Sequence, residues 1–222
     1  SNYLKQASTL RKNMESYFGA KVEGFDTYAY YEGNDILRSW ICIPLAMGIY
    51  DRAEATLDAL FCPTMFTSNG ILTQHGSQTF WDRATEYALL GALRAGETER
   101  AIPRLQYMSR VRLLGEHVPY PIEAWPEGSQ RHLSAESALY MRIITEGLFG
   151  IRPMGMSSFE LSPRLPADWD KMSLCKVQAF GSMFDIAVDR AGNKIRVQVT
   201  KPNGKRITRL INDGESCTFT IR

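Results

Sequence analysis

The sequence predicts an α+β, multidomain chain: part of a helical toroid over residues 1–153, followed by a small antiparallel β-sandwich over residues 154–222. Three observations predict this fold class. Apolar residues recur at helical spacing until the stretch "GIRPMG" at residues 150–155. After that stretch they alternate with polar residues, as in strands. The segments between the expected helices are long and aromatic, which favours functional loops over disorder.

Several helices are expected in the first part. The segment "WDRATEYALLGALRAG" is apolar on most faces, which indicates a helix buried by other helices, and Gly96 ends it as a C-cap glycine. Ser134 is expected to cap the last helix, with Glu136 in a first turn where the helix dipole favours negative charge. Pro103 is expected in a distorted first turn or at a kink. The expected helices cover residues 3–18, 35–47, 52–60, 81–95, 98–114 and 134–149.

The second part shows the two-residue alternation of half-buried strands. The turn sequences "DRAGNK" and "NDGE" separate its alternating runs, which predicts antiparallel hairpins with one buried face. The residues expected to face the core are Phe184, Ile186, Val188, Ile195, Val197, Val199, Cys217, Phe219 and Ile221.

Composition and charge argue against several classes of function. A net charge of +2 leaves no electrostatic footprint for nucleic acid or an anionic membrane, and the basic run at residues 201–209 is typical of a solvated strand face. No segment is long and apolar enough to span a bilayer. The four cysteines show no C-x-x-C spacing, so we expect neither a zinc site nor a disulfide framework. We expect no cofactor and no metal, because the three histidines also lack ligand spacing.

The stretch "PIEAWPEGSQRH" at residues 121–132 carries the groups that glycosidic hydrolysis needs. That reaction uses two carboxyl groups about the scissile bond, roughly 6.5–9.5 Å apart in inverting enzymes. It also uses a flat apolar surface for a sugar face and polar groups for hydroxyls. These residue types occur within ten positions, as Glu123, Trp125, Glu127, Gln130 and His132. On spacing alone, a polar surface loop with a structural tryptophan is the alternative.

Two earlier loops supply further residues suited to sugar binding. "GSQTFWDRATEYAL" places Trp81, Asp82 and Arg83 at a helix start, where they would line a pocket rim; the alternative is that Asp82 only complements the helix dipole. "YAYYEGNDILRSW" offers Tyr31 and Glu32 as sugar contacts. The alternative there is an aromatic loop packed on the helices, with an Asn or Asp N-cap.

An ordered series of elements resembles the tail of six-hairpin glycoside hydrolases, most closely the α-L-rhamnosidase-like families. The series is Glu123-Ala-Trp125-Pro126, then Gly128-Ser129, His132, the helix ending "TEGLFGIRP" and the phrase "SSFELSPRLPADW". Trehalases and processing α-glucosidases show a looser Glu-x-Tyr form of the first element. The resemblance covers about residues 74–188. It implies a partial (α/α)6 helical toroid, about half of a six-hairpin barrel, before the β-sandwich.

The resemblance also implies roles for single residues. Glu123 matches the general base that activates water, so inverting hydrolysis of a glycosidic bond in an oligo- or polysaccharide is the expected reaction. Glu127 would bind a hydroxyl or cap the turn. His132 matches the family histidine, and Trp81 with Asp82 matches the element that opens an earlier inner helix.

The chain departs from the family in one respect. A complete toroid has six helical hairpins, this chain supplies about three, and the family's general acid comes from the other half. Because the sequence also opens without methionine, we expect a piece of a longer enzyme. Its partners would be a carbohydrate substrate and either the missing N-terminal half or a second copy. Glu32 is the best internal substitute for the acid.

Two other functions stay open at this point. In a toroidal polysaccharide lyase, Tyr120 with His117 or His132 would abstract a proton beside a uronate carboxyl. A non-catalytic carbohydrate-binding or scaffold module would keep the aromatic loops without turnover. A metal enzyme built on His75, His117 and His132 is disfavoured by their spacing.

Overall fold

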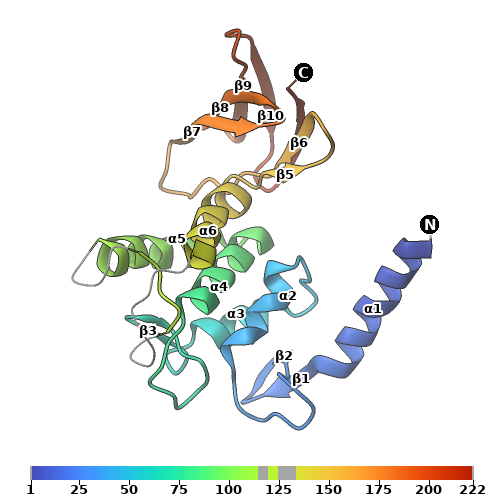
Figure 1. Cartoon of the computed structure of the whole chain (residues 1–222), viewed down its shortest axis with the longest axis vertical. Coiled ribbons are helices and arrows are strands. Elements are labelled where there is room, and N and C mark those ends of the chain that lie inside the picture. The colour runs from blue at the N-terminus through green and yellow to red at the C-terminus, as the bar shows by residue number, and fades with distance from the viewer. Residues whose placement is uncertain (1, 115–119, 125–133, 222) are drawn as a thin grey trace.

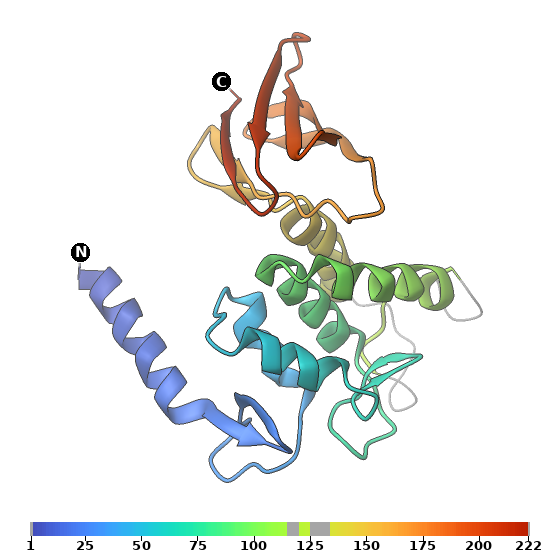
Figure 2. The ribbon, with the colours of Figure 1, turned by 180° about the vertical axis from the view of Figure 1, so that it is seen from behind.

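A computed structural model of the chain describes residues 2–114, 120–124 and 134–221. The helices lie toward one end of an elongated molecule and most strands toward the other, as Figure 1 shows. The last helix runs from the helical part up to the strands (Figures 1 and 2). In the part of the chain that the structure describes, no helix has the length and apolar character needed to cross a membrane.

The helices agree with the expected ones except near residue 35. The segment expected to be helical from residue 35 enters a helical turn only at Ser39 and ends at Ala46, with Pro44 inside it. The helical elements are α1 (Asn2–Phe18), the 3-10 turn η1 (Ser39–Ile41), α2 (Cys42–Ala46), α3 (Ala53–Phe61), α4 (Asp82–Ala95), α5 (Thr98–Tyr107), the π-helix η2 (Met108–Leu113), α6 (Ser134–Arg142) and the π-helix η3 (Ile143–Leu148).

Helix α4 is the centre of the helical part, as its apolar sequence predicts. It packs against α2, α5, α6 and η3. Ala84, Ala88 and Leu89 are completely buried, and Gly96 ends the helix in the left-handed conformation with φ of +96°. Gly91 lets α2 approach closely, because a Cβ at this position would lie 2.6 Å from Cβ of Leu45.

The predicted fold class is wrong in its main feature, the helical toroid. Over residues 2–114, 120–124 and 134–221 the structure has helices and several small antiparallel sheets, and only the coarser α+β character agrees with the prediction. A ring of helical hairpins requires each helix to pack on two neighbours. Here α1 contributes no buried residue and α2 spans only five residues, so no such ring forms.

The strands after residue 150 form two antiparallel sheets. One sheet has the order β10-β9-β8-β7 and the other the order β11-β6-β5. The predicted alternation is confirmed, since Phe184, Ile186, Val188, Ile195, Val197, Val199, Phe219 and Ile221 are buried and Cys217 is half-buried. The strands are β5 (Arg152–Pro153), β6 (Ser158–Leu161), β7 (Lys171–Ala179), β8 (Ser182–Ala191), β9 (Lys194–Thr200), β10 (Arg206–Ile211) and β11 (Cys217–Thr220).

Aromatic stacking joins the two sheets. The ring of Phe159 on β6 stacks with Phe219 on β11 and with Phe184 on β8, at centroid distances of 5.9 and 5.3 Å. Phe159 is completely buried. Such stacked pairs contribute about 0.5–1.5 kcal/mol beyond their buried area, so this cluster is the core of the strand-rich part.

A bulge interrupts β7, an edge strand of the four-stranded sheet. The pairing register between β7 and β8 shifts between Leu174 and Val177. Lys176 lies in the bulge with φ of +57°, and its backbone N–H donates to Oδ1 of Asp185 at 2.7 Å. Bulges of this kind bend a strand and interrupt its ladder of hydrogen bonds.

Two short hairpins complete the helical part. They are β1 (Gly19–Val22) with β2 (Phe25–Tyr28), and β3 (Phe66–Thr67) with β4 (Gly70–Ile71). The first hairpin connects to α1, which stands apart from the other helices in both ribbon views (Figures 1 and 2). Polar contacts hold only its second half: Arg11 donates to Asp51 at 2.7 Å, and Arg52 and Tyr28 donate to Glu15 at 2.5 and 3.1 Å.

Gly91→Ala tests the close approach of α2 to α4. Alanine favours a helix by about 1 kcal/mol over glycine, but the added methyl group would force α2 away at a cost of about 1–3 kcal/mol. We therefore expect a net loss of unfolding free energy in urea denaturation. Gly155→Ala is the control, because it adds the same methyl group at an exposed position. A more stable Gly91→Ala protein would contradict the tight packing.

Candidate functional site

The predicted loops meet at the end of the helical part where α4 begins. Arg38 forms an isolated antiparallel bridge with Gln74, and the Ser39 N–H donates to the carbonyl of Thr73 at 3.1 Å. The segment after β2 therefore lies along the segment before α4. On the other side, the backbone N–H of Ile122 donates to Oδ2 of Asp82 at 2.7 Å. This hydrogen bond brings the segment containing Glu123 to the first turn of α4.

Glu123 is exposed to solvent directly beside a buried residue. Ile122 is completely buried and hydrogen-bonded to Asp82, so the backbone that carries Glu123 is fixed at the surface. An exposed carboxylate on a fixed backbone is suited to hold a water molecule or a sugar hydroxyl. The structure thus fixes the backbone next to Glu123 on Asp82, and no hydrogen bond joins the two carboxyl groups among the described residues.

Aromatic residues from separate loops line the same end of the molecule. The ring of Trp81 packs edge-on against that of Trp40, with centroids 5.2 Å apart. The guanidinium of Arg38 lies over the rings of Tyr30 and Tyr31, at 5.4 and 5.6 Å from their centroids. Tyr31 is about half exposed, so a face remains available for stacking.

Glu32 lies farther along the same loop and faces α1. Its Oε2 accepts a long hydrogen bond from the Tyr17 hydroxyl, at 3.5 Å. No hydrogen bond to Glu123 or Trp81 is formed by Glu32 among the described residues. The structure therefore does not pair Glu32 with Glu123.

Asp82 is buried, although the sequence suggests a pocket rim. Only 1% of the residue is exposed, and its two carboxylate oxygens lie 3.2 and 3.1 Å from one guanidinium nitrogen of Arg112. Arg112 also donates to the carbonyl of Asn69 at 2.8 Å and stacks over Phe80 at 4.5 Å. Asp82 therefore positions Arg112 and Ile122, a role that neither the pocket-rim prediction nor the helix-dipole alternative included.

Two more carboxyl groups lie near Asp82. The sequence pattern did not single out Glu86, and it placed Glu136 in the first turn of its helix without indicating that it is buried. Glu86 follows one turn later on α4, and Glu136 lies in the first turn of α6; neither is exposed. Oε1 of Glu136 accepts a hydrogen bond from Nε of Arg83 at 2.6 Å. Neither carboxyl oxygen of Glu86 has a hydrogen-bond partner among the described residues. Asp82, Glu86 and Glu136 are called here the buried carboxyl cluster.

Burial sets the protonation of this cluster. It raises the pKa of Glu86 to about 10, with the charges of Asp82 and Glu136 adding to the effect and Arg83 opposing it. Burial also raises the pKa of Asp82, while Arg112 and the Ile122 N–H act in the opposite direction. Glu86 is therefore neutral at pH 7, which removes one negative charge from a crowded interior.

Several predicted residues lie outside the described residues. These are Trp125, Glu127, Gln130 and His132, together with His117. Of the predicted histidines, His75 is described, and its Nδ1 lies 2.6 Å from Oε2 of Glu23. Within residues 2–114, 120–124 and 134–221, no three His, Cys, Asp or Glu side chains are grouped to hold a metal ion.

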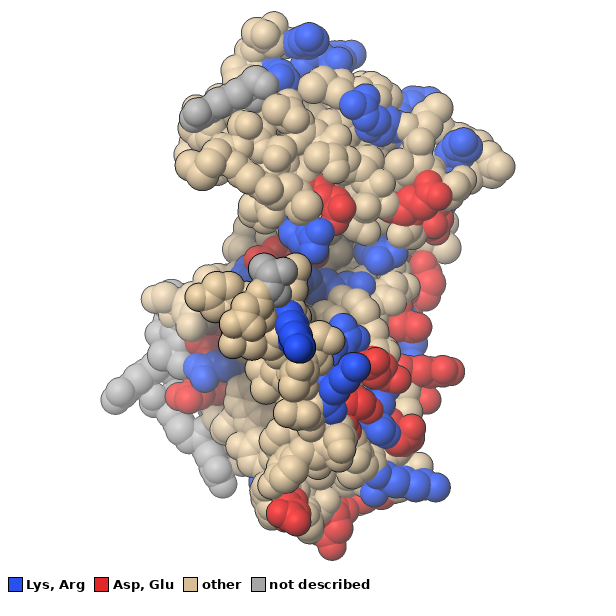
Figure 3. All heavy atoms as spheres, turned by 90° about the vertical axis from the view of Figure 1, so that its right-hand side faces the viewer, with Lys and Arg blue, Asp and Glu red and all other residues tan. Residues whose placement is uncertain are grey.

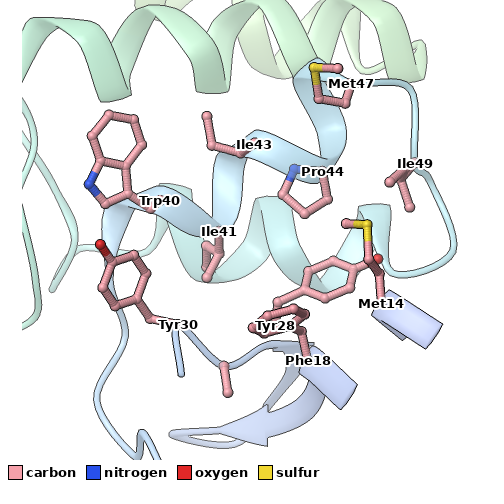
Figure 4. Close-up of a pocket in the computed structure, with 11 residues that line it drawn as sticks. Met14, Phe18, Tyr28, Tyr30, Trp40, Ile41, Ile43, Pro44, Met47 and Ile49 are labelled. Carbon is pink, nitrogen blue, oxygen red and sulfur yellow. The ribbon is translucent and has the colours of Figure 1, made fainter. Parts of the chain in front are cut away.

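An apolar groove of about 520 Å³ lies between α1 and α2 (Figure 4). It is lined by Met14, Phe18, Tyr28, Ala29, Tyr30, Trp40, Ile41, Ile43, Pro44, Met47 and Ile49. Sugars need several hydrogen-bonding side chains, and this lining offers few. The groove is therefore distinct from the Glu123 site, although Trp40 borders it and also contacts Trp81.

Comparison with known proteins adds no family assignment: no protein-family model matches the sequence, and no curated protein is significantly similar to it.

Arg112→Met tests the buried ion pair. The substitution leaves the Asp82 carboxylate buried without its charged partner, which typically costs about 3–5 kcal/mol. We expect a loss of that size in urea denaturation followed by circular dichroism. Arg110→Met is the matched control, since Arg110 is exposed two residues away on the same π-helix. Equal stability of the two variants would show that the ion pair has no net role.

Glu86→Gln tests the neutral carboxyl. In the unfolded chain, a glutamate loses its proton above about pH 4.3, whereas folded Glu86 keeps its proton up to a pKa of about 10. The unfolding free energy of the parent therefore falls by up to about 1.4 kcal/mol per pH unit as pH rises above about 5. Glutamine removes this dependence, so the variant should be the more stable protein at pH 8.

Urea denaturation from pH 5 to pH 8 measures this difference. The advantage of Glu86→Gln should grow steadily with pH. Glu54→Gln, at an exposed position on α3, is the control and should follow the parent. If the curves of parent and Glu86→Gln run parallel, Glu86 is ionised in the folded protein.

Proposed function

We propose that this chain belongs to a glycoside hydrolase and supplies the general base of an inverting reaction. The observation that carries the proposal is the placement of Glu123. Its exposed carboxylate sits beside a hydrogen bond to buried Asp82, at the end of the molecule where Trp81 and the tyrosine-rich loop meet. The ordered resemblance to the α-L-rhamnosidase-like families supports the same role for Glu123.

The reaction assigns Glu123 one step. The ionised carboxylate takes a proton from a water molecule while the water oxygen attacks the anomeric carbon and the bond to the leaving oxygen breaks. A second carboxyl group must give a proton to that leaving oxygen. Asp82, Glu86 and Glu136 are all buried and cannot reach a sugar. The resemblance assigns this acid to a segment outside the chain, and Glu127 is proposed to bind a hydroxyl.

Asp82, one residue of the buried carboxyl cluster, would hold the backbone that carries the base. The Asp82 carboxylate accepts a hydrogen bond from the backbone N–H of Ile122, and it also accepts one from the guanidinium of Arg112. Asp82 is thus a positioning residue, because it acts on substrate only through the backbone next to Glu123. A base on a fixed backbone holds its water molecule close to the position of attack. Holding reactants in the reacting geometry in this way raises the rate.

The aromatic residues would bind the sugar. The indole of Trp81 is half-buried and fixed by its edge-on contact with Trp40, so it offers a preorganised apolar wall. Tyr31 adds a second aromatic surface. Trp125, Gln130 and His132 are proposed to complete the site, with polar groups for the hydroxyls.

Glu123→Gln tests the assignment. Glutamine keeps the shape of glutamate but cannot accept the proton, so turnover should fall by about a hundredfold to ten-thousandfold. Binding of the sugar should change little. Both the parent and the variant are measured as the full-length protein that also supplies the acid: turnover by the release of reducing sugar from a panel of oligosaccharides and aryl glycosides, and binding by calorimetry. Proton NMR of the first product should show inversion at the anomeric carbon.

Glu127→Gln is the matched control, since it makes the same change four residues away. It should weaken binding more than turnover. Normal turnover by Glu123→Gln beside a dead Glu127→Gln would assign the base to Glu127. Sugar binding by the full-length protein without any hydrolysis would support a non-catalytic binding module. A product that absorbs in the near ultraviolet would indicate a lyase.

A further inference from the structure

A second cavity, of about 370 Å³, lies where the helical part meets the strands. The loop after α2, the last turn of α4, η3, β5 and the end of β6 contribute to its wall. Small-molecule sites have volumes of about 300–1,000 Å³, so this cavity is large enough for one. Basic side chains, with acidic ones beside them, lie across the waist between the two parts in the space-filling view (Figure 3). The cavity and the Glu123 site lie at opposite ends of α4, since the rise from Asp82 to Arg94 is about 18 Å.

The backbone that carries Arg164 is fixed at the wall of this cavity, called here the Arg164 cavity. The N–H of Arg164 donates to the carbonyl of Leu148 at 2.8 Å, and the N–H of Ser162 donates to the carbonyl of Gly150 at 3.2 Å. Gly150 has φ of +61°, and a Cβ at this position would clash with the carbonyl oxygen of Ser162, so this contact requires glycine. The segment after β6 is therefore held against the end of η3, and Arg164 projects from a fixed position.

The guanidinium of Arg164 has no acidic partner in the described part of the chain. It forms no hydrogen bond or ion pair with any described residue, although Arg164 is half-buried. Its Nη1 lies beside the loops at Gly96 and Gly214, where added Cβ atoms would be 3.8 and 3.6 Å away. A guanidinium has a permanent charge and five N–H donors. Arg164 can therefore bind an anionic ligand without first breaking an ion pair to a described residue.

Arg94 brings a second guanidinium to the cavity. Its Nη1 donates to the carbonyl of Ala46 at 2.5 Å, which orients the group without cancelling its charge. Oε2 of Glu146 lies 3.7 Å from Nη2 of Arg94, too far for a hydrogen bond. Glu146 is instead bound by Arg142, whose Nε and Nη2 donate to it at 2.7 and 2.9 Å. The positive charge of Arg94 is thus only weakly neutralised.

The hydroxyl of Tyr50 is close enough to both guanidinium groups to respond to their charge. Burial raises the pKa of Tyr50, while the charges of Arg94 and Arg164 act in the opposite direction. The hydroxyl is neutral at pH 7, so it supplies a donor and an acceptor beside two cations. This combination of two arginines and a hydroxyl is suited to a carboxylate, which accepts hydrogen bonds on both of its oxygens.

Two acidic residues complete the charged lining. Oε1 of Glu160 lies 3.4 Å from Nε of Arg152, and Glu146 is bound by Arg142 as described. The lining carries three arginines and two glutamates, which gives it a net charge of +1. The two carboxylates repel a second negative charge on a ligand, whereas they can accept hydrogen bonds from hydroxyl groups. The lining thus favours a ligand with one negative charge and several hydroxyls.

We propose that the Arg164 cavity binds a small hydroxylated carboxylic acid of the sugar-acid class. The ligand carboxylate lies between the guanidinium groups of Arg94 and Arg164 and accepts a hydrogen bond from the Tyr50 hydroxyl. The ligand hydroxyls donate to Glu160. Charge-assisted hydrogen bonds are roughly twice as strong as neutral ones, so the arginines contribute most to affinity. This site is separate from the Glu123 site and does not depend on the proposed hydrolase activity.

Arg164→Gln tests the site through the binding of glucuronate to this chain, measured by calorimetry. Glutamine removes the charge, so the dissociation constant should rise by about tenfold or more. The fold should be retained, because the guanidinium has no partner among the described residues. Tyr50→Phe removes only a hydroxyl and should raise the dissociation constant by about fivefold. Arg206→Gln, at an exposed position on β10, is the matched control and should leave binding unchanged.

Ligand controls and NMR define the chemistry and the place. Glucose has the hydroxyls without the carboxylate, and inorganic phosphate has the charge without the ring hydroxyls. Each should bind at least about tenfold more weakly than glucuronate. In the parent chain, glucuronate should shift the amide signals of Gly48, Gly147 and Gly150, which line the cavity.

Four results would overturn the proposal. The first is the absence of saturable glucuronate binding at millimolar concentrations. The second is equal affinity of Arg164→Gln and Arg206→Gln. The third is phosphate or glucose binding as tightly as glucuronate, which would make the cavity a general anion or sugar site. The fourth is a set of shifted amides confined to Ile122 and Glu123, which would assign the sugar acid to the other site.

Discussion

Burial of acidic side chains on α4 is the constraint on which the rest of the helical part depends. Helix α4 is enclosed by α2, α5, α6 and η3, yet it carries Asp82 and Glu86 on successive turns. A carboxylate removed from water must be paired or neutralised. The fold uses both solutions, since Arg112 pairs with Asp82 while Glu86 keeps its proton. Arg112 reaches this point from η2.

The same constraint determines where the surface carboxylate lies. Asp82 has one oxygen that accepts from the Ile122 N–H as well as from Arg112. Ile122 is completely buried, and the next residue in the chain, Glu123, is exposed. In this way an interior ion pair and a surface group are joined by one backbone hydrogen bond. A substitution that disturbs the Asp82–Arg112 ion pair would therefore also shift the position of Glu123.

The sequence predicted elements well where the signal is local. Helix α4 was expected as a buried helix, and the strands β8, β9 and β11 carry a clear two-residue alternation. Their core-facing residues were correctly expected, except that Cys217 is only half-buried. The toroid failed because ring closure depends on contacts between distant helices, which periodicity does not report. Asp82 was expected at a pocket rim, because an acidic residue in the first turn of a helix is equally typical of an exposed and of a buried helix start. Glu86 was missed, although an acidic residue in an otherwise apolar helix was a usable signal.

The bulge in β7 has a consequence for how molecules of this chain can meet. An unpaired edge of a flat strand offers a row of amides and carbonyls to any other extended chain, and sheets grow into aggregates by that route. At Lys176 the ladder is broken, the backbone turns into the left-handed region, and a charged side chain stands at the edge. The β7 edge of the four-stranded sheet thus carries a bulge and a charge, two features that disfavour the addition of another strand.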